Sequence, residues 1–525
     1  MTKPSALRTI VLGTGSNYLR VFVRMFTGII TFRLLFHSLD AQGFGFYQLL
    51  WSTIGYTVLL DFGLGISVVR SLAARIDSDD PHAKQESREV VSTVFFAYVG
   101  LAFVLMGLVL WGGDRLLHSL TFDSAGAIDR YRTTALIFAS VAVFSFPFGV
   151  FREALRGQGR PHVCNVIDVC CGLLQTGLIA WACLTHKPLE LITLLSVSSS
   201  SLAYLIMGVV AMQEPEVRPR LTDFRWSRIR ELSGFSIVAY LITMASILSM
   251  RVDQLVIGTL VSVQAIAIYT PGSKLMGLFH MLATQMQETL GPVAARLATQ
   301  KADPSRLRTL FLKSQRWSVM VATLVVTPLL LDLRGAIALL AGELHPSDEM
   351  LLTARMLIIA IAAAVIAAEC ARRILMMAGH HRLLFWFAIT ESAINFSVSV
   401  WLSIRWRSCS GAAAGTLVAL STIAFTVMPV VACRVLDVKL SEFWLVISGR
   451  GLVANALAIG VAVVFFHAPV PLAPSARFVV GSLLCGLAAL PGWWLHGLLP
   501  DERAFVQAQL AGRFSRVAMA GKEAP

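Results

Sequence analysis

Two arginines lie one helical turn apart inside an apolar segment near the start of the chain. Arg20 and Arg24 fall near the middle of residues 13–36, a stretch otherwise long and apolar enough to cross a bilayer. A charged side chain at bilayer depth is costly, so it normally points into a cavity or toward an internal partner. Their shared polar face favours a cavity that holds water or an anion over a structural ion pair. That face comprises Gly13, Asn17, Arg20, Arg24, Thr27, Gly28 and Thr31.

The composition is that of a protein that crosses the membrane many times. The 525 residues are 56% hydrophobic and 14% charged, with a mean hydropathy of +0.71, whereas soluble proteins carry about 25% charged residues. The net charge of +13 could indicate nucleic-acid binding, but the cations concentrate in alternate loops, which indicates membrane topology instead. The eight cysteines lack the paired spacings of zinc ligands or a disulfide framework. We expect no nucleic acid, no metal ion and no cofactor.

Apolar runs of about 20 residues predict an all-α polytopic membrane protein with about fourteen transmembrane helices. One set of alternate loops, which includes both termini, holds 29 Lys and Arg residues, and the other set holds 7. Because cytoplasmic loops carry the excess of cations, both termini are predicted to be cytoplasmic. The predicted helices span residues 11–36, 43–69, 89–112, 132–151, 163–184, 189–212, 232–258, 264–292, 317–340, 350–371, 382–404, 411–433, 444–467 and 476–499.

Predicted helices 1–6 and 7–12 are copies of one another. The segment AQGFGFYQ with Tyr47 matches VQAIAIYT with Tyr269, and FREALRGQGRP with Arg152 matches ARRILMMAGHH with Arg372. Each copy has an even number of crossings, so the copies share one orientation and are related by a pseudo-twofold axis along the membrane normal. Their interface is expected to be a cavity lined chiefly by helices 1, 2, 7 and 8.

The repeat divides the chain into four parts. Residues 1–212 form an N-terminal six-helix lobe, and residues 232–436 form a C-terminal six-helix lobe. A basic linker, 213–231, joins them on the cytoplasmic side. Residues 437–525 contain helices 13 and 14 and a cytoplasmic tail, for which the repeat offers no counterpart.

These segments resemble Wzx-type polysaccharide (O-antigen) repeat-unit flippases, within the multidrug/oligosaccharidyl-lipid/polysaccharide exporter superfamily. The resemblance rests on AQGFGFYQLL, LLDFGLGISVVR, FREALRGQGRPH, RVDQLVIGTL and AIAIYTPGSKL, which span most of residues 10–435. It implies a V-shaped two-lobe fold in the bacterial cytoplasmic (inner) membrane. It also implies that an undecaprenyl-pyrophosphate-linked oligosaccharide is moved to the outer leaflet for O-antigen, capsule or exopolysaccharide synthesis. Expected partners are this substrate, membrane lipid, and polysaccharide polymerase and chain-length machinery.

A lipid pyrophosphate needs cations inside the membrane, and the planar guanidinium of arginine holds phosphate oxygens in pairs. Arg20 and Arg24 are the first candidates, with Asn17 as a hydrogen-bonding neighbour for phosphate or sugar. Lys274 is the second candidate, just after Pro271 and Gly272, which are expected to interrupt the helix; alternatively, Lys274 snorkels to the outer surface. Arg251 is a further candidate, and it does not face Asp253, two residues away.

Six acidic residues at bilayer depth are candidate proton or sodium sites for ion-coupled alternating access. Some of them must instead balance the arginines. Two of them occupy nearly equivalent places in the two copies, which suits either an ion site near the pseudo-twofold axis or ion pairs. Two others lie toward the cytoplasmic ends of their helices, where a role as gate or cap is favoured. The six are Asp61, Asp168, Asp253, Glu288, Glu369 and Glu391; Asp168 and Glu391 are the equivalent pair, and Asp61 and Glu288 are the candidate caps.

Two other function classes remain open. A drug/cation antiporter of the same superfamily is expected to line its cavity with acids and aromatics, whereas the first helix here offers two cations. A membrane-embedded glycan polymerase or ligase would be an enzyme and usually has one long external loop, but the longest external loop here, 113–131, is short. No nucleotide-binding motif is present, because GTGSN at 13–17 lacks the GK[ST] ending. We therefore expect a transporter, not an enzyme.

Overall fold

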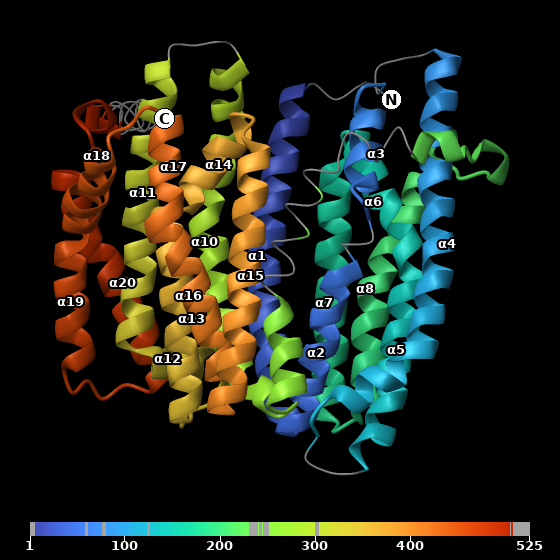
Figure 1. The fold of residues 1–525 in the computed structure, drawn as a ribbon, viewed down its shortest axis with the longest axis horizontal. Coiled ribbons are helices and arrows are strands. Elements are labelled where there is room, and N and C mark those ends of the chain that lie inside the picture. Colours follow the sequence, from blue (N-terminus) through green and yellow to red (C-terminus); the bar gives the residue numbers. More distant parts are fainter. Residues whose placement is uncertain are drawn as a thin grey trace, which may run out of the picture.

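The computed structural model describes residues 6–57, 61–75, 80–122, 126–229, 240, 244, 251–299, 304–504 and 506–507. This part of the chain folds into helices and contains no β-strand (Figure 1). Ten of the described helical segments are long and apolar enough to cross a membrane by length and composition. The prediction of an all-α polytopic membrane protein is therefore confirmed.

The N-terminal lobe consists of the first eight helices and one short 3-10 turn. Its long helices correspond to predicted helices 1–6, with predicted helices 2 and 4 each built from two consecutive pieces. The elements are α1 (Ala6–Ser38), α2 (Ala41–Thr57), α3 (Leu64–Ala73), α4 (Pro81–Ser119), α5 (Ala127–Ser145), η2 (Phe146–Phe148), α6 (Gly149–Gly157), α7 (Pro161–Leu184) and α8 (Leu189–Ala211).

The C-terminal lobe repeats this order of elements. It starts with a helix described from residue 251 to residue 260 and continues with α10 (Ala265–Thr299), α11 (Pro304–Leu331), α12 (Leu333–Ala341), α13 (Asp348–Ala367), α14 (Glu369–Met377), α15 (His381–Trp406), α16 (Ser410–Thr422), the π-helical turn η5 (Ile423–Val427) and α17 (Met428–Val435).

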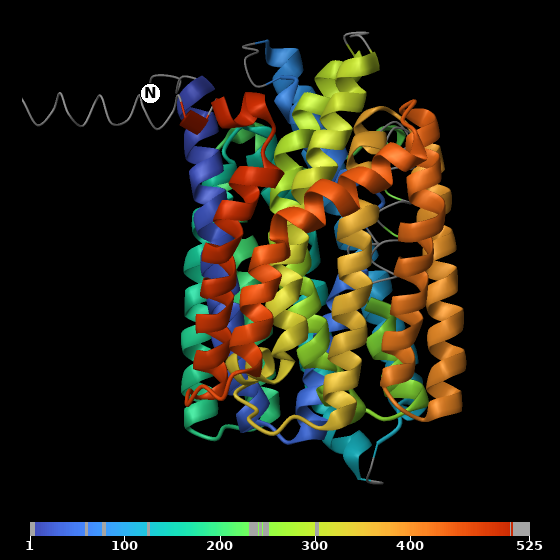
Figure 2. The same cartoon turned by 90° about the vertical axis from the view of Figure 1, so that its left-hand side faces the viewer.

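Two further membrane helices follow the C-terminal lobe and pack against its α11 on the far side from the N-terminal lobe (Figures 1 and 2). The salt bridge between Arg316 on α11 and Glu502, with an N–O distance of 2.5 Å, holds the end of this pair in place. The pair comprises α18 (Leu440–Leu445), η6 (Val446–Leu452), η7 (Val453–Asn455) and α19 (Ala456–His467), then α20 (Pro474–Gly492) and η8 (Trp493–Gly497).

The two copies end their fourth and tenth predicted helices with the same turn. Gly159 after α6 and Gly379 after α14 have φ angles of 68° and 89°, a left-handed conformation that glycine adopts without strain. The following residue donates its backbone N–H to a carbonyl five residues earlier in both copies, Arg160 to Leu155 and His380 to Leu375, each at 2.9–3.0 Å. Both turns are Schellman motifs, so the repeat seen in the sequence is also a repeat of backbone geometry.

The copies differ in predicted helices 2 and 8. Predicted helix 2 is interrupted at Phe62 and Gly63, which have φ angles of 49° and 75°. In contrast, α10 runs without a break from Ala265 to Thr299, so the expected interruption at Pro271 and Gly272 is wrong. Gly272 instead permits close helix packing, because a Cβ there would lie 2.7 Å from the Cα of Ala354 on α13.

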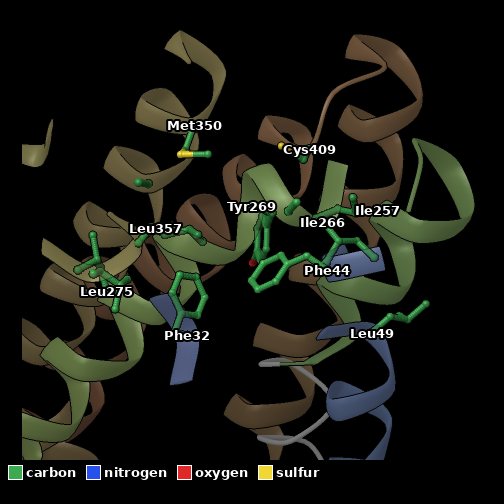
Figure 3. Packing of buried hydrophobic residues seen from close by; sticks show 14 of the residues in the cluster. Phe32, Phe44, Leu49, Ile257, Ile266, Tyr269, Leu275, Met350, Leu357 and Cys409 are labelled. Atoms are coloured by element: carbon green, nitrogen blue, oxygen red, sulfur yellow. The ribbon is translucent and has the colours of Figure 1, made fainter. Parts of the chain in front are cut away.

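The lobes share a core at one end and have separate cores at the other. We call the end that carries the turns at 158–160 and 378–380, rich in Lys and Arg, the basic end, and the other the opposite end. At the opposite end one hydrophobic cluster unites both lobes, with Phe32 and Phe44 packed near Ile266 and Tyr269 (Figure 3). Toward the basic end each lobe has its own cluster. The helices accordingly diverge toward the basic end, which gives the predicted V shape (Figure 1).

Backbone hydrogen bonds close the opposite end. The N–H of Thr121 in the N-terminal lobe donates to the carbonyl of Gly258, and the N–H of Val263 donates to the carbonyl of Thr121, both at 2.9 Å. Gly45 on α2 lies so close to this segment that a Cβ would be 2.0 Å from the carbonyl oxygen of Val263. The structure therefore represents a state that is closed at the opposite end.

Candidate functional site

The first helix presents two different exposed faces. Arg24 and Gly28 are exposed on the predicted polar face. At 3.6 residues per turn the opposite side carries Leu19, Phe22 and Phe26, each more than half exposed. Between these faces α1 packs along α7, where Thr31 and Thr176 are in hydroxyl contact at 3.3 Å. The apolar face suits lipid, and the polar face is turned away from it.

Arg24 has no partner among the described residues. Its side chain is exposed, and its guanidinium makes no hydrogen bond or salt bridge within that part of the chain. Lys274 on α10 is exposed as well, and both Arg24 and Arg251 lie within electrostatic range of it. Exposed cations on α1 and α10, which belong to opposite lobes, therefore lie within electrostatic range of one another.

Arg20 is bound, in contrast to Arg24. It donates to the side-chain oxygen of Asn17 at 2.8 Å and to Asp168 on α7 at 3.4 Å. Arg152 on α6 donates to the same oxygen of Asp168 at 2.7 Å. Asn17 thus orients an arginine in this state instead of lying free for phosphate or sugar. Two guanidinium groups share one carboxylate, which leaves this part of the site with excess positive charge.

Arg251 connects the two lobes. It donates hydrogen bonds to the backbone carbonyl oxygens of Trp51 and Ser52 on α2, at 3.3 and 3.4 Å. Together with the other four cations it completes a row in which each member lies within electrostatic range of a neighbour. We call this row the cation cluster; it consists of Arg20, Arg24, Arg152, Arg251 and Lys274.

The candidate coupling residues of the two copies form corresponding ion pairs. Arg372 on α14 binds Glu391 on α15 and also lies 3.6 Å from Glu369. This arrangement repeats the pair of Arg152 and Asp168 in the N-terminal lobe. Asp168, Glu369 and Glu391 therefore balance arginines. Of the two alternatives left open by the sequence, the geometry favours ion pairs for these acids.

Asp253 is the buried carboxylate that no cation of the described residues neutralises. Its Oδ2 accepts hydrogen bonds from the hydroxyls of Tyr269 and Thr416, both at 2.7 Å, and the Asn395 side chain also bonds it. Its Oδ1 is buried and has no hydrogen-bond partner in that part of the chain. Buried charges are normally paired or coordinate an ion. Three polar side chains from three other helices thus surround one acid that no cation of the described residues neutralises.

The N-terminal lobe holds a neutral copy of this network. Tyr47, which corresponds to Tyr269, contacts the hydroxyl of Ser196 at 2.6 Å. Gln175, 220 residues before Asn395, donates to the same hydroxyl at 3.2 Å. The place of Asp253, 222 residues earlier, is taken by Thr31. Only the C-terminal network of this pair therefore contains a carboxylate.

Of the remaining two acids, Asp61 has a described side chain and Glu288 does not. Asp61 accepts hydrogen bonds from the Tyr98 hydroxyl and, at 3.0 Å, from the backbone N–H of Gly65 at the start of α3. This geometry matches the cap that its position near a helix end favours. Glu288 lies on α10, but its side chain is outside the described residues. The described residues contain no group of three or more metal-ligating side chains of the His, Cys, Asp or Glu types.

Sequence reasoning alone missed some members of these sites. Arg152 was counted among the cations of the basic loop 152–160, although its match with Arg372 in the repeat was a signal that it holds a defined place. Asn395 and Thr416 carry no signal by themselves, because polar residues of this type are common in membrane helices. The signal that could have found them is the repeat, because Gln175 and Ser196 precede them by 220 residues, the offset between FREALRGQGRP and ARRILMMAGHH.

Comparison with solved structures shows the class of fold. The lipid II flippase MurJ, in an inward closed conformation, matches with a TM-score of 0.69 and 11% identity over 92% of this chain and 98% of that chain. A multidrug resistance MATE family transporter of the MOP superfamily matches in an inward-facing conformation with a TM-score of 0.62, at 14% identity over 81% of this chain and 95% of that chain. The fold is that of the MOP-superfamily transporters. No curated protein matches the chain.

The sequence also matches a family model. Residues 39–344 match the model described as "Polysaccharide biosynthesis protein". The chain belongs to this polysaccharide biosynthesis family. The family resemblance that the repeated motifs indicate is thereby confirmed.

Proposed function

We propose that this protein flips an undecaprenyl-pyrophosphate-linked oligosaccharide across the bacterial cytoplasmic membrane for surface polysaccharide synthesis. The observation that carries the proposal is Arg24, which is exposed on α1, has no partner among the described residues and lies within electrostatic range of Lys274. Uncompensated cations in a membrane protein mark a substrate path, and a pyrophosphate offers the oxygens that guanidinium groups bind in pairs. The match to a polysaccharide biosynthesis family supports this class of cargo.

The charge of the cluster argues against a cationic drug as cargo. In the N-terminal lobe, Arg20 and Arg152 share one carboxylate, Asp168, and Arg24 has no carboxylate partner among the described residues. An amphipathic cation would meet like charges there, whereas a pyrophosphate would neutralise them. The lobes diverge at the basic end, so in the orientation indicated by the loop charges the path opens toward the cytoplasm, where the lipid-linked substrate is assembled.

Coupling to an ion gradient is assigned to Asp253 in this proposal. A proton on its carboxyl group, or a sodium ion held by its oxygens, would satisfy the partnerless Oδ1. The hydrogen bond from Tyr269 links this acid to α10, the helix that also carries Lys274. Binding of the ion in one state of the lobes and release in the other would then drive the cycle.

The decisive experiment is transport in proteoliposomes. A fluorescently labelled undecaprenyl-pyrophosphate oligosaccharide is reconstituted with the protein, and its accessibility in each leaflet is measured under imposed proton, sodium and voltage gradients. The expected result is translocation that one ion gradient accelerates. Transport of an amphipathic cation without movement of the lipid-linked sugar would overturn the proposal.

Orientation is tested separately by reporter fusions. A fusion after Arg160, in the basic turn, should give a cytoplasmic signal, and a fusion after Leu120 should give a periplasmic signal. The reverse pattern would invert the direction of the proposed path.

A further inference from the structure

We propose that Asp168 is a resident counter-anion that competes with the pyrophosphate of the substrate for Arg20, and so sets how tightly the substrate is held. This inference rests on the proposed function. It adds a residue that tunes affinity without itself binding the substrate. The contacts of Arg20 in this structure, in which Asp168 occupies part of the cation cluster, carry the argument.

The two contacts of Asp168 differ in length. The bond from Arg152 is 2.7 Å long and the bond from Arg20 is 3.4 Å long, on the same carboxylate oxygen. The Arg152 contact has the length of a strong charge-assisted hydrogen bond, whereas the Arg20 contact is at the outer limit of hydrogen-bond distance. Asp168 is therefore held by Arg152 and only loosely by Arg20, so an incoming anion can take Arg20 without breaking the stronger pair.

The geometry leaves Arg20 within reach of a substrate. The side chains of Arg20, Arg152 and Asp168 are each 20% exposed, so none of the three is fully buried. The Nε of Arg20 is buried and has no hydrogen-bond partner among the described residues. Arg24, one turn further along the same helix, is exposed and within electrostatic range. A pyrophosphate bound to Arg24 would therefore lie on the same face of α1 as Arg20, within electrostatic range of its guanidinium.

The charge balance of the two pairs is reversed. In the N-terminal lobe two arginines share Asp168, whereas in the C-terminal lobe Glu391 and Glu369 share Arg372. The N-terminal arrangement lacks one negative charge, and a bound anion supplies it. The C-terminal arrangement needs none. The C-terminal lobe thus provides an internal control, because it has the corresponding salt bridge but no excess positive charge for an added anion.

Competition of this kind has a consequence for the transport cycle. While the substrate is bound, Arg20 contacts the pyrophosphate, and Asp168 stays paired with Arg152 only. When the substrate leaves, Asp168 recaptures Arg20, which lowers the free energy of the empty site and so favours release. Without Asp168, the site would bind the pyrophosphate more tightly and release it more slowly.

The test measures binding of inorganic pyrophosphate to the full-length protein in nanodiscs by calorimetry, together with flipping in proteoliposomes. Asp168→Asn should bind pyrophosphate about tenfold more tightly than the wild type, a typical size for coupling between sites, and should flip more slowly at saturating substrate. In an Arg20→Ala background the same Asp168→Asn change should alter the affinity less than twofold. A full gain in that background, or no gain in the single variant, would show that Asp168 does not compete for Arg20.

Two further variants complete the test. Glu391→Gln is the matched control, because Arg372 keeps Glu369 as a partner, and its pyrophosphate affinity should equal that of the wild type. If Asp168→Asn alone fails to fold, the pair Arg152→Gln with Asp168→Asn removes one charge of each sign, leaves Arg20 free for the anion and should still bind more tightly. Weaker binding by this pair would overturn the inference. If the wild type itself binds no pyrophosphate, the proposed function fails instead.

Discussion

The hydroxyl of Tyr269 donates a 2.7 Å hydrogen bond to Asp253, and both side chains are buried. If this acid couples transport to an ion, Asp253→Asn should still bind pyrophosphate but should flip lipid-linked sugar at a rate that no longer responds to an ion gradient. The reason is that the amide neither titrates nor attracts a cation. The measurement is flipping with and without the gradient.

The repeat supplies the control for this prediction. Tyr269→Phe removes a donor to Asp253 and should shift the ion dependence, whereas Tyr47→Phe removes the corresponding hydroxyl from the neutral network and should not. Retention of a full gradient response by Asp253→Asn would exclude Asp253 as the coupling group.

Arg24→Ala should abolish flipping while the protein inserts and folds as the wild type does. No carboxylate of the described residues pairs with Arg24, so its removal strands no buried acid, and a neutral helix inserts more easily than a charged one. Arg24→Lys should restore part of the rate, because lysine keeps the charge but loses the paired geometry. Flipping rate and expression level are measured together.

Arg33 provides the comparison on the same helix. It is exposed near the opposite end, away from the polar face, and its guanidinium lies close to Gly342 at the end of α12. Arg33→Ala should flip at close to the wild-type rate. A normal rate in Arg24→Ala, or a defect confined to protein level and cured by removing Asp61 or Asp168, would refute the binding role of Arg24.

Gly45→Ala should weaken closure at the opposite end. The added Cβ would lie 2.0 Å from the carbonyl oxygen of Val263, a distance that forces α2 away from the segment it contacts in the other lobe. A cysteine placed at the buried Ile266 in detergent-solubilised protein should then react faster with a maleimide. Gly100→Ala, whose Cβ meets no atom within 4 Å, is the control. Equal reaction rates in the two variants would contradict the proposed contact.

Glu502→Gln should destabilise the C-terminal helix pair. Arg316 is nearly fully buried, and Glu502 neutralises its charge. Loss of one partner of a buried pair costs roughly 3–5 kcal/mol. The melting temperature in detergent should fall markedly. Asp501→Asn breaks the neighbouring exposed pair with Lys313 and should leave the melting temperature nearly unchanged. A similar effect of both changes would argue against a structural role for the buried pair.

Periodicity and repetition made much of the fold predictable. The polar face of α1 could be read from the sequence because residues three and four apart lie on one side of a helix, and the exposed Arg24 agrees with it. The turns at Gly159 and Gly379 follow from the matched FREALRGQGRP and ARRILMMAGHH segments. The fourteen apolar runs were found because a membrane helix must satisfy its backbone internally and cover itself with apolar side chains.

The details of the site were not predictable, because they depend on contacts between distant segments. Arg20 and Arg24 look equivalent in the sequence, but only Arg20 lies where α7 presents Asp168. The partners of Asp253 come from three other helices, so no local spacing in the sequence predicts their contacts with it. Predicted helix 2 breaks at Phe62 and Gly63 while the Pro271 region does not, since packing rather than local propensity decides the outcome.

The paired networks around Tyr47 and Tyr269 bear on why the two lobes form one polypeptide. A symmetric homodimer of six-helix subunits would present identical residues in both halves, so a carboxylate at Asp253 would have its twin at Thr31, and the excess of arginine around Asp168 would recur around Glu391. Covalent fusion removes that restriction. One half can then hold the excess of arginine around its carboxylate while the other holds a carboxylate without a cation, an asymmetry that two identical subunits could not have.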